Sequence, residues 1–122
     1  MPPRDTSLRV EDMLEAITRI EAHSAGLTAE QFGQDQKTLD AVVRNIEVIG
    51  EAAIHLDDDV AALRPAVPWT DIRAKRHILV HEYFGVDAEI VWETVVRDLP
   101  ILRRELEEPL KQLPQHDRPS SD

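Results

Sequence analysis

The sequence predicts an all-α protein, an antiparallel bundle of four to five helices. Apolar residues recur at steps of three and four residues in several long windows, which is the period of an amphipathic helix. The sequence has no sustained alternation of apolar and polar residues, and aromatic residues make up only 4% of it, so strands are not expected. At 122 residues the chain has the length of one domain, for which we expect residues 1–108. Residues 109–122 hold three prolines and are expected to form a flexible C-terminal tail.

The first expected helix covers about residues 7–24, because one stripe of it is apolar and the other faces are charged. Gly26 suits the end of this helix, where a left-handed residue is common. The run Thr28-Ala29-Glu30-Gln31 has the form of a capping box and opens a short helical turn that ends near Gly33. Asp35 can then cap the next helix.

The second long helix is expected over about residues 37–56, with apolar positions that can pack against two neighbours. Gly50 lies inside it at a cost of about 0.5 to 1 kcal/mol relative to alanine, so we expect another helix to approach closely there. The run Asp57-Asp58-Asp59 lacks the spaced oxygen ligands and the glycine of a calcium loop. We interpret it as a solvated helix end followed by the negatively charged start of a short helix.

The second half of the chain is expected to hold two more long helices. Two prolines interrupt the middle of the chain, Pro65 and Pro68. A third long helix is expected over about residues 69–84 and ends at Gly85. Asp87 can cap a fourth helix that continues past Pro100, where we expect a kink.

Composition and charge exclude several classes of protein. No cysteine is present, so a disulfide framework, a cysteine-ligated metal site and a thiol nucleophile are excluded, and a reducing cytoplasm fits best. The charged N-terminus is unlike a secretory signal, and no run approaches the roughly 18 apolar residues of a membrane span. The net charge of −10 argues against non-specific binding to nucleic acid or to anionic membranes.

One segment departs from this acidity. Residues 70–83 hold three basic and two acidic side chains, whereas the rest of the chain holds 11 basic and 22 acidic ones. The candidate site residues of the segment are Arg73, Lys75, Arg76, His77, His81 and Tyr83. On a helix with about 100° per residue, His77 and His81 share a face, but Arg76 and His81 lie about 140° apart. The side chains of Arg76 and His81 can converge only if Arg76 bends along a groove, or if a second chain places its own copy of this helix alongside.

Three interpretations of this segment compete. His77 and His81 have the ligand spacing of a zinc metallopeptidase helix, but the glutamate that acts as the base in such helices is absent between them. In a structural interpretation, His81 is a hydrogen-bonded helix residue, Tyr83 packs its ring, and the basic side chains pair with acidic neighbours. The third interpretation is RNA phosphate chemistry. Histidine suits proton transfers near neutral pH and arginine suits the phosphoryl oxygens, with no metal or other cofactor required.

The run Arg76-His77-Ile78-Leu79-Val80-His81-Glu82-Tyr83 resembles the signature of the HEPN superfamily, in its HepT-like branch. That signature is an arginine, a polar residue, three more residues, a histidine, one residue and a tyrosine. The helix at residues 40–53 resembles the second long helix of the family. Further stretches match in order and spacing: Pro68-Trp69 with Ile72, residues 83–87, residues 90–92 and residues 98–100. The resemblance therefore covers most of the chain.

The resemblance implies a compact helical homodimer in which the two signature helices lie near the dimer axis and line one cleft. It implies a metal-independent endoribonuclease that acts as a toxin, with Arg76 and His81 as the catalytic pair and His77 as the polar residue after the arginine. It also implies a partner, a nucleotidyltransferase-fold antitoxin that can attach AMP to Tyr83. The added phosphates would block the cleft where RNA binds.

The chain departs from the common family pattern at Lys75, where an apolar residue is usual. With Arg73 and His77, this lysine is a candidate for a supporting or RNA-binding role. The overall acidity favours an alternative function, a non-catalytic helical dimer that binds a nucleotidyltransferase partner or a nucleotide. Under the catalytic hypothesis, an acidic shell around one basic helix predicts weak and strongly salt-sensitive RNA binding.

Overall fold

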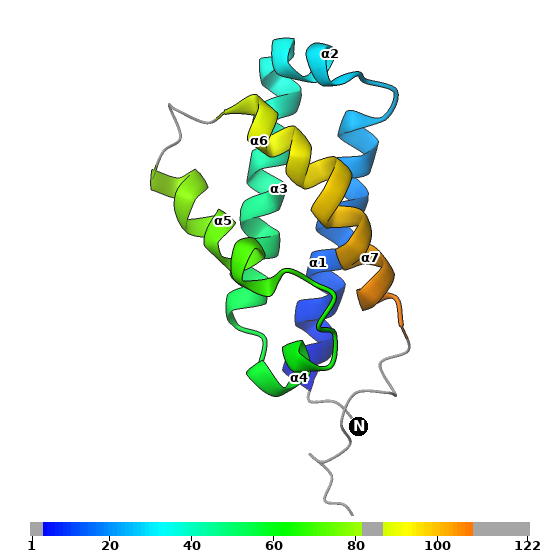
Figure 1. Cartoon of the computed structure of the whole chain (residues 1–122), viewed down its shortest axis with the longest axis vertical. Coiled ribbons are helices and arrows are strands. Elements are labelled where there is room, and N and C mark those ends of the chain that lie inside the picture. The colour runs from blue at the N-terminus through cyan, green and yellow to red at the C-terminus, as the bar shows by residue number, and fades with distance from the viewer. Residues whose placement is uncertain (1–3, 82–86, 109–122) are drawn as a thin grey trace, which may run out of the picture.

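The computed structural model describes residues 4–81 and 87–108, with residue 4 and residues 76–81 as backbone only. No strand occurs in these two ranges, and the all-α prediction is confirmed (Figure 1). The predicted tail at residues 109–122 and the predicted helix end at Gly85 lie outside the described residues. The elements in chain order are α1 (Arg4–Ser24), α2 (Ala29–Gln34), α3 (Gln36–Ile54), α4 (Asp58–Ala62), α5 (Trp69–His81), α6 (Ala88–Glu93), the π-helix η2 (Thr94–Asp98) and α7 (Leu99–Leu106).

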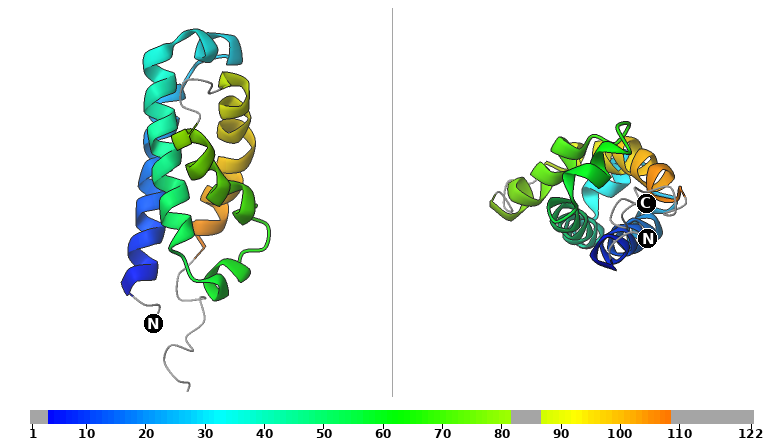
Figure 2. Two further views of the ribbon diagram at one scale, coloured as in Figure 1. Left: turned by 90° about the vertical axis from the view of Figure 1, so that its left-hand side faces the viewer. Right: turned by 90° about the horizontal axis from the view of Figure 1, so that it is seen from below.

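Two long antiparallel helices, α1 and α3, form the base of the bundle. They pack along their length, α5 lies against α3, and α7 returns to α1 (Figures 1 and 2). The short helix α2 joins one end of this pair and contacts α6. The largest fully buried side chains form the core between these helices, and they are Phe32, Met13, Ile17, Ile20, Ile49, Leu102 and Val42. Since α3 is the main neighbour of α5, it sets the position of the helix that carries the candidate site.

Local capping residues set the connection between α1 and α3, as the sequence predicts. Gly26 has a φ of 78°, the left-handed conformation that favours glycine. The Thr28 hydroxyl accepts from the Gln31 backbone N–H at 3.1 Å, and the Gln31 side chain accepts from the Thr28 backbone N–H at 3.0 Å. These two bonds complete the predicted capping box. The Asp35 carboxylate accepts from the Thr38 backbone N–H at 3.0 Å and caps α3.

Replacement of Asp35 by alanine is expected to lower the melting temperature at neutral pH. Hydrogen bonds from the backbone N–H and hydroxyl of Thr38 hold the pKa of Asp35 below its usual value. The resulting stabilisation is present above the pKa of the unfolded chain and is lost as the pH falls through the lower folded pKa. Thermal melts should therefore show the deficit of the variant shrinking below about pH 4.

Asp57→Ala is the matched control for Asp35→Ala, because Asp57 precedes α4 without a capping bond from its side chain. Its effect on the melting temperature at neutral pH should be smaller. An equal effect of the two variants would contradict the capping role of Asp35.

The middle of the chain also follows the sequence prediction. Residues 57–59 are exposed, and the last two of them lie in the first turn of α4. The connection at residues 63–68 contains both prolines, and α5 begins directly after it. The indole N–H of Trp69 donates to the Arg64 carbonyl at 3.1 Å, which fixes the turn into α5.

A π-helix interrupts the last helix directly before Pro100, where the sequence predicts a kink. Asp87 caps α6 as predicted, but the backbone N–H of Leu99 donates to the carbonyl of Thr94, five residues back. Pro100 is the second residue of α7, so its lack of a backbone N–H falls directly after this irregular turn, at the junction of η2 and α7. The single kinked helix expected after Asp87 is therefore three successive segments, with the irregular turn placed before the proline.

Candidate functional site

An arginine in the second turn of α5 attaches this helix to the end of α3. The Arg73 guanidinium donates from Nε to the Ala53 carbonyl at 2.9 Å and from Nη2 to the Leu56 carbonyl at 3.3 Å. Both carbonyls lie where the regular hydrogen bonds of α3 run out. A cation at the C-terminal end of a helix is also favoured by the helix dipole. Arg73 therefore caps α3 from a neighbouring helix, and it fixes the position of the first two turns of α5 relative to the end of α3.

Two further contacts hold this guanidinium in place. Nη1 of Arg73 lies 3.6 Å from Oδ1 of Asp58, and the guanidinium carbon lies 5.8 Å from the centroid of a Trp69 ring. The Asp58 side chain is 95% exposed, so solvent weakens that ion pair. Through these contacts Arg73 helps to hold α5 in place against α3. A contact between Arg73 and RNA stays a prediction.

The remaining candidate residues follow Arg73 along the same helix. The backbone of α5 is helical as far as His81, so Arg76, His77 and His81 lie in its last two turns. The helix register puts His81 one turn after His77, as expected from the sequence. The convergence of the Arg76 and His81 side chains stays a prediction, and Tyr83 lies outside the described residues.

Lys75 lines a hollow of about 280 Å³ between α5 and the segment formed by α6 and η2. The other polar residues that line it are Asp71, Glu93, Thr94, Arg97 and Asp98. Burial raises the pKa of Asp98 above its usual value, and the nearby charge of Lys75 opposes this rise. Lys75 therefore lies among carboxylates on the flank of α5, and its predicted contact with phosphate is untested.

The positive charge of this segment is thus unevenly distributed along α5. Arg73 lies against α3 and Asp58, and Lys75 lies near Asp98. Any excess of positive charge that could attract a phosphate therefore depends on the last two turns of the helix. The sequence could not reveal this, because the α3 carbonyls and Asp58 that contact Arg73, and Asp98 near Lys75, come from distant parts of the chain.

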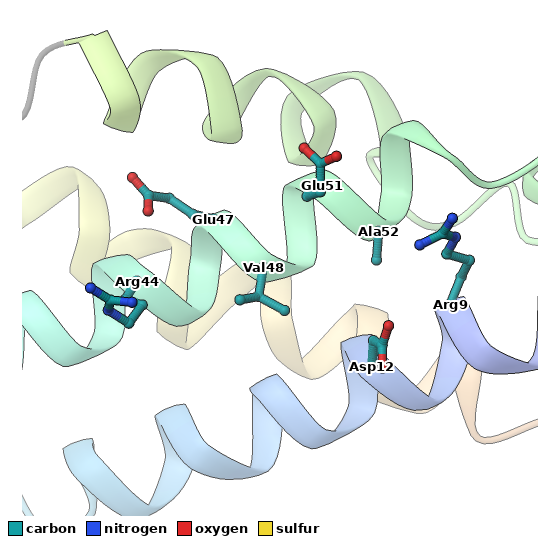
Figure 3. Close-up of a pocket in the computed structure, with 7 residues that line it drawn as sticks. All are labelled: Arg9, Asp12, Arg44, Glu47, Val48, Glu51 and Ala52. Atoms are coloured by element: carbon teal, nitrogen blue, oxygen red, sulfur yellow. The ribbon is translucent and has the colours of Figure 1, made fainter.

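A second hollow, of about 330 Å³, lies between α1 and α3 (Figure 3). Its lining consists of Arg9, Asp12, Arg44, Glu47, Val48, Glu51 and Ala52. Figure 3 shows Arg9 and Arg44 toward opposite ends of this lining, with carboxylates between them. Such a mixture favours neither an anion nor a cation. Sequence reasoning missed the hollow because each of its charged residues is typical of the exposed face of an amphipathic helix.

The structure gives no support for a metal site in the part of the chain whose side chains it describes. No group of three or more histidine, aspartate or glutamate side chains lies together there as a set of ligands. The zinc interpretation of His77 and His81 is not tested by this finding, because their side chains are not among those described. The described helices also include none that is long and apolar enough to span a membrane.

Comparison with known proteins gives matches that cover nearly the whole helical domain. A family model described as "Ribonuclease HepT-like" matches residues 13–109. A protein of Thermococcus cleftensis named "Probable ribonuclease HepT" is 41% identical over 98 residues, which cover 80% of this chain and 89% of that protein. A "Putative RNase" of Methanocaldococcus jannaschii is 37% identical over 120 residues, covering 98% of this chain and 99% of its own length. No solved structure gives a significant match.

Proposed function

Because the chain belongs to the family of HepT-like ribonucleases within the HEPN superfamily, we propose that it is an endoribonuclease whose site lies at the end of α5. The observation that carries the proposal is the family match over residues 13–109, which includes the whole run from Arg76 to Tyr83. The names of the relatives support RNA as the substrate, since they describe a ribonuclease or an RNase.

In the proposed reaction, the protein cuts RNA by internal transfer without a metal ion. A base takes the proton of the 2′-hydroxyl, and the freed oxygen attacks the adjacent phosphorus. The bond from phosphorus to the 5′-oxygen breaks while an acid protonates that oxygen, which leaves a 2′,3′-cyclic phosphate and a free 5′-hydroxyl. Histidine titrates near neutral pH, so His81 suits one of the two proton transfers. Arg76 suits the negative charge that builds up on the phosphoryl oxygens.

A homodimer would complete this site. By helix register, Arg76 and His81 lie about 140° apart around α5, so one copy of the helix presents them on different sides. Two α5 helices beside a two-fold axis would place both pairs in one cleft. The arrangement of the bundle supports this proposal, because α5 packs mainly against one helix, α3. A single neighbouring helix covers only one side of α5.

The proposed biological setting is a toxin–antitoxin pair. The partner would be a nucleotidyltransferase-fold antitoxin that transfers AMP to the hydroxyl of Tyr83, two residues after His81. The transfer joins the tyrosine oxygen to the α-phosphorus of ATP and releases pyrophosphate. The attached phosphate would then lie close to where the RNA phosphate binds, and its charge and bulk would oppose RNA binding.

The purified protein is expected to cleave RNA in the presence of EDTA. Mass spectrometry of the fragments should find cyclic phosphate and 5′-hydroxyl ends, and the rate at low RNA concentration should fall steeply as salt rises, because screening weakens phosphate binding. A protein that cuts no RNA under any metal-free condition, yet binds a nucleotidyltransferase tightly, would instead support the non-catalytic dimer.

Replacement of Tyr83 by phenylalanine is expected to preserve RNA cleavage and abolish neutralisation by AMP transfer. Phenylalanine keeps the ring but has no hydroxyl to accept the nucleotide. The measurement is intact mass after incubation with the antitoxin and ATP, together with growth inhibition in cells that express both proteins. A mass increase that persists in Tyr83→Phe would place the modification on another residue.

A further inference from the structure

A groove of about 480 Å³ runs between α2 and α6, on surfaces that the proposed reaction does not use. It is lined by Ala29, Gly33, Ala88, Glu89, Ile90, Trp92 and Glu93. Small residues on both helices keep it hollow. A Cβ atom added at Gly33 would lie 3.8 Å from the Ala88 Cβ, in ordinary van der Waals contact, so α2 and α6 already approach closely at its base.

The aromatic residue of this groove packs against the core. The rings of Trp92 and the fully buried Phe32 lie 5.1 Å apart between centroids, at an interplanar angle of 44°. Trp92 itself is half-buried, so one part of its indole packs on the core and another part lines the groove. A preformed aromatic surface loses little conformational entropy when a ligand covers it.

Packing within the described part of the bundle does not account for Ile90, which also lines the groove. Its side chain is 56% exposed, although isoleucine is among the residues most often buried. It borders both the α2–α6 groove and the hollow beside Lys75. Ile90 and Trp92 are two positions apart on α6, so they lie on different sides of the helix, with Glu89 and Glu93 on the face between them. Trp92 therefore supplies apolar surface at one edge of the groove and Ile90 at the other.

The rim of the groove is negatively charged. Glu89 and Glu93 line it, and Glu30 is exposed in the first turn of α2. Glu93 pairs with Arg97, whereas the Glu89 carboxylate has no ion-pair partner among the described residues. This rim repels RNA and anionic lipid headgroups. It also disfavours a second copy of the chain, which carries a net charge of −10.

We propose that the α2–α6 groove is a docking site for a segment of another protein that presents an apolar side chain between lysine or arginine residues. The apolar side chain would lie on Trp92, the flanking cations would pair with Glu89 and Glu93, and the segment would continue across the groove to Ile90. Since the groove contains no residue of the 76–83 run, this inference does not depend on RNA cleavage.

The test uses the full-length ¹⁵N-labelled protein and short synthetic peptides. The first peptide carries leucine between lysines and arginines, the second has glutamate in place of the basic residues, and the third has serine in place of leucine. The first peptide should shift the Trp92 indole and the amides of α2 and α6, with a Kd below about 1 mM. Ile90→Ser and Glu89→Lys should each weaken its binding about tenfold or more.

Val96→Ser is the matched control, because Val96 is 51% exposed on η2 and does not line the groove. It should bind the first peptide like the unmodified chain. No binding at about 1 mM peptide, equal binding of the glutamate peptide, or shifts confined to other helices would overturn the proposal. Sedimentation of Ile90→Ser adds a further check, since conversion of an oligomer to a monomer would show that a second copy occupies the groove.

Discussion

Replacement of His81 by alanine is expected to abolish RNA cleavage while the protein stays folded. Loss of a general acid or base slows a reaction by about 10²- to 10⁴-fold. Because alanine has the highest helix propensity, the substitution at His81 is compatible with the helical backbone of α5. The measurement is the single-turnover rate on a defined oligonucleotide in EDTA, with the helical circular dichroism and melting temperature recorded for the same preparation.

Two further histidine variants make this result specific. His23 is exposed in the last turn of α1, so His23→Ala should cleave RNA like the unmodified protein. His77→Ala should retain more activity than His81→Ala if His77 only supports RNA binding, and its effect should appear in KM rather than in kcat. Cleavage at the original rate by a His81→Ala preparation free of contaminating nuclease would contradict the proposed catalytic pair.

Replacement of Arg73 by alanine is expected to lower both stability and activity. The variant loses the hydrogen bonds to the Ala53 and Leu56 carbonyls at the C-terminal end of α3, which should reduce the free energy of unfolding by about 1 to 3 kcal/mol. For a domain of this size, the melting temperature falls by about 4 °C for each kcal/mol. At a temperature where the variant is fully folded, displacement of α5 should still slow kcat by about tenfold or more, since misplacement of catalytic groups by about 1 Å has such effects.

Arg64→Ala is the matched control for Arg73→Ala. Arg64 also donates from Nε to a carbonyl near a helix end, that of Glu105 at 2.9 Å, but it ties the connection before α5 to α7. Its loss should lower the melting temperature and leave kcat per folded molecule unchanged. Arg73→Lys should recover little, because lysine keeps the charge but cannot donate from a planar fork to two carbonyls. Equal kcat in Arg73→Ala and Arg64→Ala would show that Arg73 acts on stability alone.

Much of the fold is predictable because many signals in this sequence are local. The capping box at Thr28, the caps at Asp35 and Asp87 and the left-handed Gly26 each depend on residues only a few positions away. Such contacts form within one turn, so the residue pattern alone identifies them. The family motif from Arg76 to Tyr83 is equally local, which is why the sequence could point to the candidate site before the fold was known.

The features that the sequence did not reveal depend on distant parts of the chain. Arg73 contacts carbonyls 17 and 20 residues earlier, so its role as a cap of α3 has no local pattern. Lys75 is basic by composition, yet the fold places it near Asp98. The groove beside Trp92 exists because α2 and α6 meet in the bundle. The count of basic residues in the 70–83 segment therefore overestimated the positive charge that is available to bind a phosphate.

Because of the π-helix, we expect the last part of the chain to tolerate the deletion of one residue. Val91 and Leu99 are eight positions apart and are both 3% exposed. In an unbroken α-helix, eight residues at about 100° each would turn Leu99 about 80° away from the side that Val91 faces. The wider turn at residues 94–98 accommodates one extra residue. Val91 and Leu99 are therefore separated by about two full turns and face the same side of the helix. Deletion of Val96 could thus restore a regular helix with its buried side in register, whereas a deletion within α7 would rotate the buried Leu106 toward solvent.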